Sequence, residues 1–87
     1  MSEDIEVRRK RAAWRAAHRG TKELDLLVGR FAGARLPAMT AADLDHFERF
    51  LAVTTPEIQS WLLAPSVPVS AEFADVVAEI RQFHGLE

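Results

Sequence analysis

Hydrophobic residues recur every three or four positions through most of the chain, and no segment alternates between polar and apolar residues for long enough to predict a strand. This period is typical of amphipathic helices with one buried face. The pattern predicts an all-α fold, a small compact five-helix bundle, in which Trp14 anchors the first helix to the core. The helices are expected at residues 3–18, from a cap at 21 to the proline at 37, 40–51, 55–62 and 70–83.

Four of the predicted helices begin at a residue whose side chain can cap a helix N-terminus. Thr40 is followed three residues later by Asp43, in the arrangement of a capping box, and Thr55 precedes a proline that suits the first turn of a helix. Thr21 and Ser70 are the corresponding residues of the second and the last helix. These signals set the expected starts of the helices.

Length and composition predict one domain, residues 1–87. Hydrophobic residues make up 48% of the chain and charged residues 28%, which are values of globular and not of disordered proteins. A domain of this size has a small core, so we expect function to lie on the surface rather than in a deep cofactor pocket. The absence of cysteine excludes disulfides, thiolate metal sites and a cysteine nucleophile.

The sequence also bears on where the protein acts. No apolar stretch approaches the roughly 20 residues of a bilayer-spanning helix, and the N-terminal residues lack the apolar core of a signal peptide. The stretch from Arg8 to Arg19 is rich in arginine like a transit peptide, but the acidic Glu3, Asp4 and Glu6 precede it. We therefore expect this stretch to belong to the folded domain, and the protein to act in the bacterial cytoplasm without inserting into a membrane.

The segment from Arg19 to Asp25 gathers polar groups around a glycine between two predicted helices. Arg19 offers a planar fork of donors for a partner's carboxylate, while Glu23 and Asp25 offer acceptors. Gly20 allows another backbone to approach closely. These features indicate a contact surface. From local chemistry alone, the favoured alternative is that Gly20 only ends one helix and Glu23 only complements the dipole of the next.

A second candidate surface is basic. Arg8, Arg11, Arg15 and Arg19 follow each other at spacings of three and four, which places them along one side of a helix. Such a strip can bind an acidic partner or phosphate, or form a solvated helix face. The alternative function is a small nucleic-acid-binding or regulatory module that uses this Arg8–Arg19 face. The net charge of −2 and the lack of a known nucleic-acid-recognition motif argue against nucleic acid as the partner.

The three histidines, His18, His46 and His84, lack the close helical spacing of a metal-binding pair. They are expected to be solvated or to lie at an interface, and His18 adjoins Arg19 and can add a donor to the same contact surface. The serines fall in cap or loop contexts, so that no Ser-His-Asp arrangement or carboxylate pair can be assigned. The sequence therefore predicts neither a metal site nor an enzyme.

One motif resembles that of a known family. The residues that carry it are Arg19-Gly20-x-x-Glu23-x-Asp25, followed by Leu26, Leu27 and Phe31. They are similar to the Arg-Gly-x-x-Glu motif and trailing apolar residues of the succinate dehydrogenase FAD assembly factors. Further agreement lies at residues 44–51 and 56–62, and the resemblance extends over residues 8–83.

The resemblance implies a five-helix bundle that binds the FAD-carrying flavoprotein subunit of succinate dehydrogenase, and of related fumarate reductases, during maturation. In that reaction a histidine of the flavoprotein attacks the 8α-methyl position of the flavin, so the assembly factor supplies positioning and no catalytic group. FAD belongs to the client, and the chain itself is expected to hold no cofactor tightly and to be a monomer. The expected partner-binding residues are Arg8, Arg11, Arg15, His18, Arg19, Gly20, Glu23 and Asp25.

Overall fold

The structure, a computed structural model, describes residues 4–64 and 66–86. Within these residues it contains five α-helices, a short 3-10 helix and no strand, which confirms the predicted all-α fold. None of the helices in this described part has the length and the apolar character needed to cross a bilayer. In chain order the elements are α1 (Ile5–Ala17), α2 (Lys22–Arg35), the 3-10 helix η1 (Leu36–Ala38), α3 (Ala41–Leu51), α4 (Thr55–Leu63) and α5 (Ala74–Phe83).

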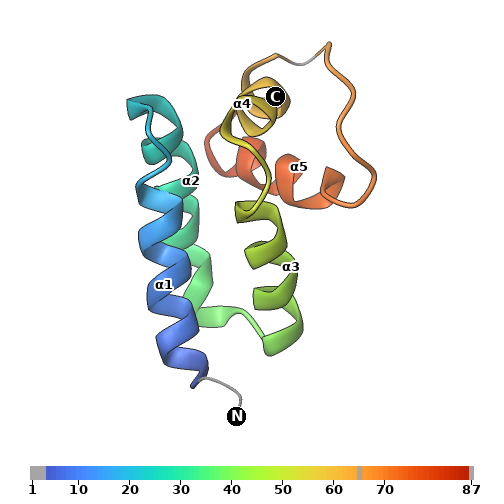
Figure 1. The fold of residues 1–87 in the computed structure, drawn as a ribbon. Helices are drawn as coiled ribbons and strands as arrows, with labels where there is room; N and C mark the ends of the chain where they lie inside the picture. The colour runs from blue at the N-terminus through green and yellow to red at the C-terminus, as the bar shows by residue number, and fades with distance from the viewer. Residues whose placement is uncertain (1–3, 65, 87) are drawn as a thin grey trace.

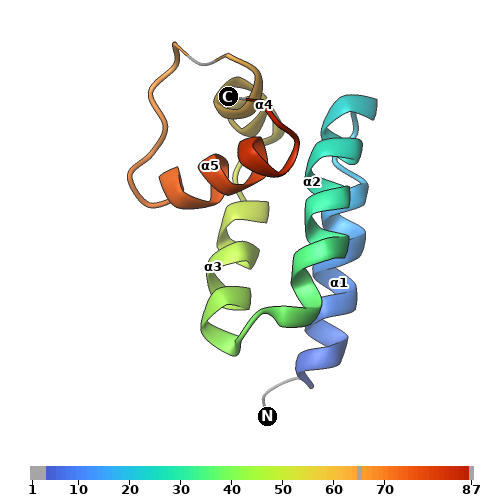
Figure 2. The ribbon, with the colours of Figure 1, turned by 180° about the vertical axis from the view of Figure 1, so that it is seen from behind.

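The first two helices form an antiparallel hairpin, and α3 packs beside it (Figure 1). Helix α5 runs across the end of α3 and contacts both α2 and α4, as the view from behind also shows (Figure 2). The hairpin is tight because Gly29 of α2 lies against Ala17 of α1. A Cβ atom placed on Gly29 would be only 3.1 Å from the Ala17 Cα atom. This contact holds the end of α1, from which the short connection to α2 begins, close against α2.

One apolar core joins all five helices. Burying a large apolar side chain contributes about 1.5–3 kcal/mol, so this core is what holds the helices together. Helix α1 contributes mainly the alanines Ala12 and Ala16, which lets it pack closely. The central members, each at most 2% exposed, are Leu24, Val28, Phe31, Leu44, Phe47, Phe50, Ile58, Leu62 and Ile80.

Trp14 does not anchor α1 to the core, and this prediction is wrong. Its side chain is 64% exposed, because the buried face of α1 is formed by Ala12 and Ala16 and Trp14 lies on the opposite face. The other tryptophan, Trp61 of α4, is only 8% exposed and belongs to the core. The buried residues of α1 are thus small, and the large side chain of this helix points away from the core.

Two of the predicted helix caps are confirmed. The hydroxyl oxygen of Thr21 accepts a hydrogen bond from the Leu24 N–H at 3.2 Å. Thr40 and Asp43 exchange the two hydrogen bonds of a capping box, each at 3.1 Å. The residue predicted to begin α1, Glu3, lies outside the described residues.

The other two predicted caps are displaced. Thr54 is the N-cap of α4, and Thr55 is its first helical residue. The Thr55 hydroxyl instead donates to the carbonyl oxygen of Arg19 at 3.3 Å. Helix α5 begins later than expected, because Ser70 starts a turn in which its carbonyl oxygen accepts from the Phe73 N–H. Neither Thr55 nor Ser70 is therefore the N-cap residue of the helix for which it was predicted.

Candidate functional site

The connection between α1 and α2, residues 18–21, contains the Arg-Gly pair of the motif. Gly20 has a φ of +107°, which residues with a Cβ atom rarely adopt, and it turns the chain into α2. Asp25, in the first turn of α2, accepts hydrogen bonds from the backbone N–H groups of Arg19 and Gly20, the latter at 3.2 Å. The sequence predicts that the Asp25 carboxylate faces a partner. In the structure, its Oδ1 atom stabilises this turn.

The Arg19 side chain is turned inward. Its Nη1 donates to the carbonyl oxygen of Leu51 at 2.6 Å, and its Nη2 donates to that of Val53 at 2.9 Å. Nη2 also lies 3.3 Å from the Thr55 hydroxyl oxygen. Carbonyl groups at the end of a helix lack partners within the helix, so Arg19 caps α3 and ties the α1–α2 connection to the start of α4. Burial lowers the pKa of the guanidinium, and the nearby Asp25 carboxylate partly offsets this effect.

The other end of the basic strip is also engaged within the molecule. Arg8 donates to both carboxylate oxygens of Glu48 on α3, from Nε at 3.2 Å and from Nη2 at 2.7 Å. Nη2 also pairs with Asp45. The pKa of Arg8 is raised mainly by the hydrogen bonds to Glu48 and, to a smaller extent, by the hydrogen bond to Asp45. The strip is therefore not a uniform surface, because Arg8 links α1 to α3 and Arg19 links the α1–α2 connection to the end of α3 and the start of α4.

Five of the eight expected partner-binding residues are exposed: Arg11, Arg15, His18, Gly20 and Glu23. Apart from Gly20 itself and its two chain neighbours, no residue has an atom within 4 Å of the position that a Gly20 Cβ would take, so another molecule can approach this backbone. Glu23 lies in the first turn of α2. The structure thus places the glycine and the glutamate of the motif at the surface, while its arginine is partly buried and turned toward the end of α3.

Sequence reasoning missed one neighbour of this surface. The exposed indole of Trp14 stacks on the His18 ring, with the ring centroids 4.3 Å apart and the planes 15° from parallel. The two residues are four positions apart, a spacing that places side chains next to each other on a helix. In the sequence, the exposed Trp14–His18 pair could have been found from this spacing and from the alanines on the opposite face of the helix.

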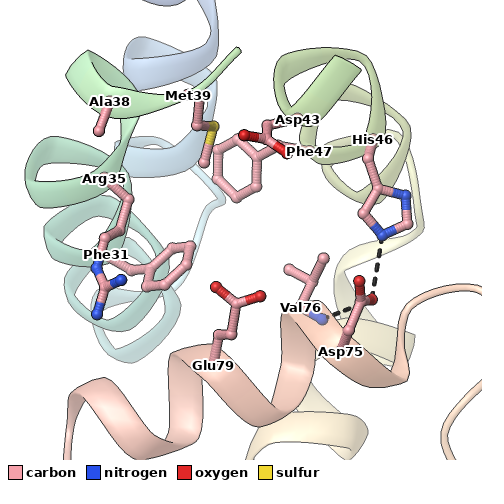
Figure 3. Close-up of a pocket in the computed structure, with 10 residues that line it drawn as sticks. All are labelled: Phe31, Arg35, Ala38, Met39, Asp43, His46, Phe47, Asp75, Val76 and Glu79. Carbon is pink, nitrogen blue, oxygen red and sulfur yellow. Dashed lines mark hydrogen bonds and ion pairs between the residues drawn. The ribbon is translucent and has the colours of Figure 1, made fainter. Parts of the chain in front are cut away.

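A groove lies between α2, α3 and α5 (Figure 3). Its volume is about 240 Å³, below the range of about 300–1,000 Å³ that is usual for small-molecule sites, so it does not enclose a dinucleotide such as FAD. Phe31, Phe47 and Val76 provide apolar walls, and the carboxylate of Glu79 points toward the open space.

The groove also holds a histidine and carboxylate pair. His46 Nε2 lies 3.1 Å from Asp75 Oδ1, and this hydrogen bond is the main reason that the pKa of Asp75 is lowered. None of the ten residues lining the groove is serine, threonine or cysteine, so no hydroxyl or thiol nucleophile from this lining lies beside the pair. Among the described residues, no group of three or more side chains could hold a metal ion.

Comparison with known proteins identifies relatives along nearly the whole chain. Residues 10–84 match the family profile Sdh5, described as "Flavinator of succinate dehydrogenase". The FAD assembly factor SdhE of Acetobacter pasteurianus is 42% identical over 60 residues, which cover 69% of this chain and 55% of the relative. The protein of the same name from Coxiella burnetii is 32% identical over 84% of this chain and 88% of its own length.

A eukaryotic relative is similar over a longer stretch. The mitochondrial succinate dehydrogenase assembly factor 2 of Dictyostelium discoideum is 32% identical over 93% of this chain and 57% of its own length. The chain thus spans little more than half of the Acetobacter and Dictyostelium relatives and most of the Coxiella one. The extent of the profile match and these identities show that the chain belongs to the Sdh5/SdhE family of FAD assembly factors.

Proposed function

We propose that this chain, acting as one domain in the bacterial cytoplasm, binds the flavoprotein subunit of succinate dehydrogenase and promotes the covalent attachment of FAD to it. Flavoproteins of related fumarate reductases are further clients. The observation that carries the proposal is the family's motif, Arg19-Gly20-x-x-Glu23, on an ordered helix junction where the glycine and the glutamate are exposed. The FAD and the histidine that bonds to it belong to the client.

The residues of the junction have separate tasks in this proposal. Arg19 and Asp25 hold the turn through the internal hydrogen bonds described above. Gly20 lets the backbone of the client come close, and Glu23 accepts hydrogen bonds from it. Arg15 and His18 extend the contact along the end of α1. Holding the client in one arrangement brings its histidine and the flavin together, which lowers the barrier without a catalytic side chain from this protein.

The test replaces Glu23 with glutamine and uses Glu57→Gln as the matched control. Both residues are exposed and lie in the first turn of a helix, so the two substitutions alter the helix dipole interaction alike. Hydrogen bonds to charged groups contribute about 1.5–3 kcal/mol, so Glu23→Gln is expected to slow covalent flavin formation about tenfold. The measurement is flavin fluorescence of the purified flavoprotein, incubated with FAD and each variant, on a denaturing gel.

Glu57→Gln is expected to support the same rate as the wild type. Equal rates for Glu23→Gln and the wild type would remove Glu23 from the client interface. Thermal unfolding of both variants checks that any loss of rate does not come from loss of folding.

A further inference from the structure

The outer face of α1 carries an exposed apolar stripe. Trp14 is 64% exposed and Val7 is 48% exposed, and both lie opposite the buried Ala12 and Ala16. Positions 7, 14 and 18 fall on one side of a helix, so His18 continues the stripe toward the junction. Tryptophan is strongly buried on average in folded proteins, and an indole left in water at this extent has an energetic cost. This face therefore offers apolar area that a partner can bury.

The Trp14 side chain is also held in place before any partner binds. Its ring stacks on His18, and His18 Nδ1 lies 2.7 Å from the carbonyl oxygen of Trp14. A large aromatic surface that is already ordered loses little conformational entropy on binding. Buried tryptophans are among the residues that contribute most at protein interfaces. Trp14 has the properties of an anchor side chain.

The charges around the stripe indicate the chemistry of the partner. Lys10 and Arg15 are exposed on the same helix, whereas the chain as a whole has a net charge of −2. A positive border complements carboxylates on the other molecule. Single-stranded nucleic acid could also stack on an exposed indole. One face of the Trp14 ring is already covered by His18, and the acidic remainder of the chain repels phosphates, which favours a protein.

We propose that the Val7–Trp14–His18 stripe is a docking surface for the flavoprotein subunit, with Trp14 inserted into an apolar socket that carboxylates border. The inference rests on the proposed function and names the contact surface. His18 is two residues from Gly20, so the stripe is continuous with the junction that holds the motif. The client interface then extends along α1 instead of ending at the motif.

The test follows the two tryptophans by fluorine NMR. The chain is labelled with fluorotryptophan and the purified flavoprotein subunit is left unlabelled, so only Trp14 and Trp61 give signals. On addition of the flavoprotein, the Trp14 signal is expected to change its chemical shift and to lose its sensitivity to heavy water. The buried Trp61 signal serves as the internal control, because its surroundings in the core do not change.

The second measurement is the affinity of two variants for the flavoprotein subunit. Trp14→Ala is expected to weaken binding of the flavoprotein about 30-fold, since loss of an anchor residue costs about 2 kcal/mol. Val67→Ala, which alters another exposed apolar residue in the loop after α4, is expected to bind like the wild type. Both substitutions leave the core intact.

The outcomes separate this inference from the proposed function. If the wild-type chain does not bind the flavoprotein at all, the proposed function fails and this surface fails with it. If the wild type binds while the Trp14 signal is unchanged and Trp14→Ala binds equally well, only the docking surface is overturned. A Trp14 signal that responds to a single-stranded oligonucleotide and not to the flavoprotein would assign the stripe to nucleic acid and overturn the inference.

Discussion

Replacing Arg19 with alanine is expected to lower the free energy of unfolding by about 2–4 kcal/mol, because hydrogen bonds to charged groups contribute about 1.5–3 kcal/mol each and are not additive. The variant loses the donors to the Leu51 and Val53 carbonyl oxygens, and with them the link between the α1–α2 connection and the end of α3. Urea denaturation of both proteins measures the difference. Arg15→Ala removes an exposed arginine from the last turn of α1, four residues before Arg19, and is expected to change stability by less than about 0.5 kcal/mol.

A second variant, with lysine at position 19, distinguishes the charge of the side chain from the geometry of its hydrogen bonds. Arg19→Lys keeps the positive charge but cannot reach both carbonyl groups with one planar fork, so it should recover less than half of the lost stability. If Arg19→Ala unfolds at the same urea concentration as Arg15→Ala, the inward hydrogen bonds do not stabilise the fold. Arg19 would then be available to a partner, as the sequence alone indicated.

The substitution Gly29→Leu is expected to destabilise the hairpin, because overpacking usually costs about 1–3 kcal/mol and the helix preference of leucine over glycine offsets at most about 1 kcal/mol. A Cβ atom at this position would be 3.1 Å from the Cα and 3.2 Å from the Cβ of Ala17, so α1 and α2 must move apart. For a domain of this size, such a loss lowers the melting temperature by roughly 4–8 °C per kcal/mol. Thermal unfolding followed by circular dichroism measures the shift.

Gly33→Leu provides the matched control in the same helix. Outside its chain neighbours and the nearby backbone of α2 itself, no atom lies within 4 Å of its Cβ position, and leucine favours a helix over glycine by up to about 1 kcal/mol. This control is therefore expected to raise the melting temperature. A rise for both variants would show that the contact between Gly29 and Ala17 does not limit the approach of the two helices.

The helices could be predicted from the sequence because their signals are local. The apolar spacing is visible in segments such as 73–83, and the cap signals of Thr21 and Thr40 involve residues only three positions away. The family could be predicted because its motif is contiguous. Membership in a family of assembly factors also supports the expectation that the chain is not an enzyme.

The orientation of the motif's arginine could not be predicted, because its partners are distant in the sequence. Arg19 binds carbonyl groups 32 and 34 residues further along the chain, and Arg8 binds a carboxylate 40 residues away. No local pattern reports such contacts. Helix periodicity alone also does not show which face of α1 is buried, because alanine and tryptophan are both apolar. The prediction that the larger residue, Trp14, belongs to the core is therefore wrong.

Whether this chain promotes FAD attachment is decided by covalent flavin fluorescence of the succinate dehydrogenase flavoprotein on a denaturing gel. Cells that lack this protein are compared with the same cells complemented with the wild-type chain, under conditions that require the enzyme. We expect the signal to fall strongly in the deletion and to return with the wild type. An unchanged signal in the deletion, at equal amounts of flavoprotein, would show that this chain is not needed for FAD attachment.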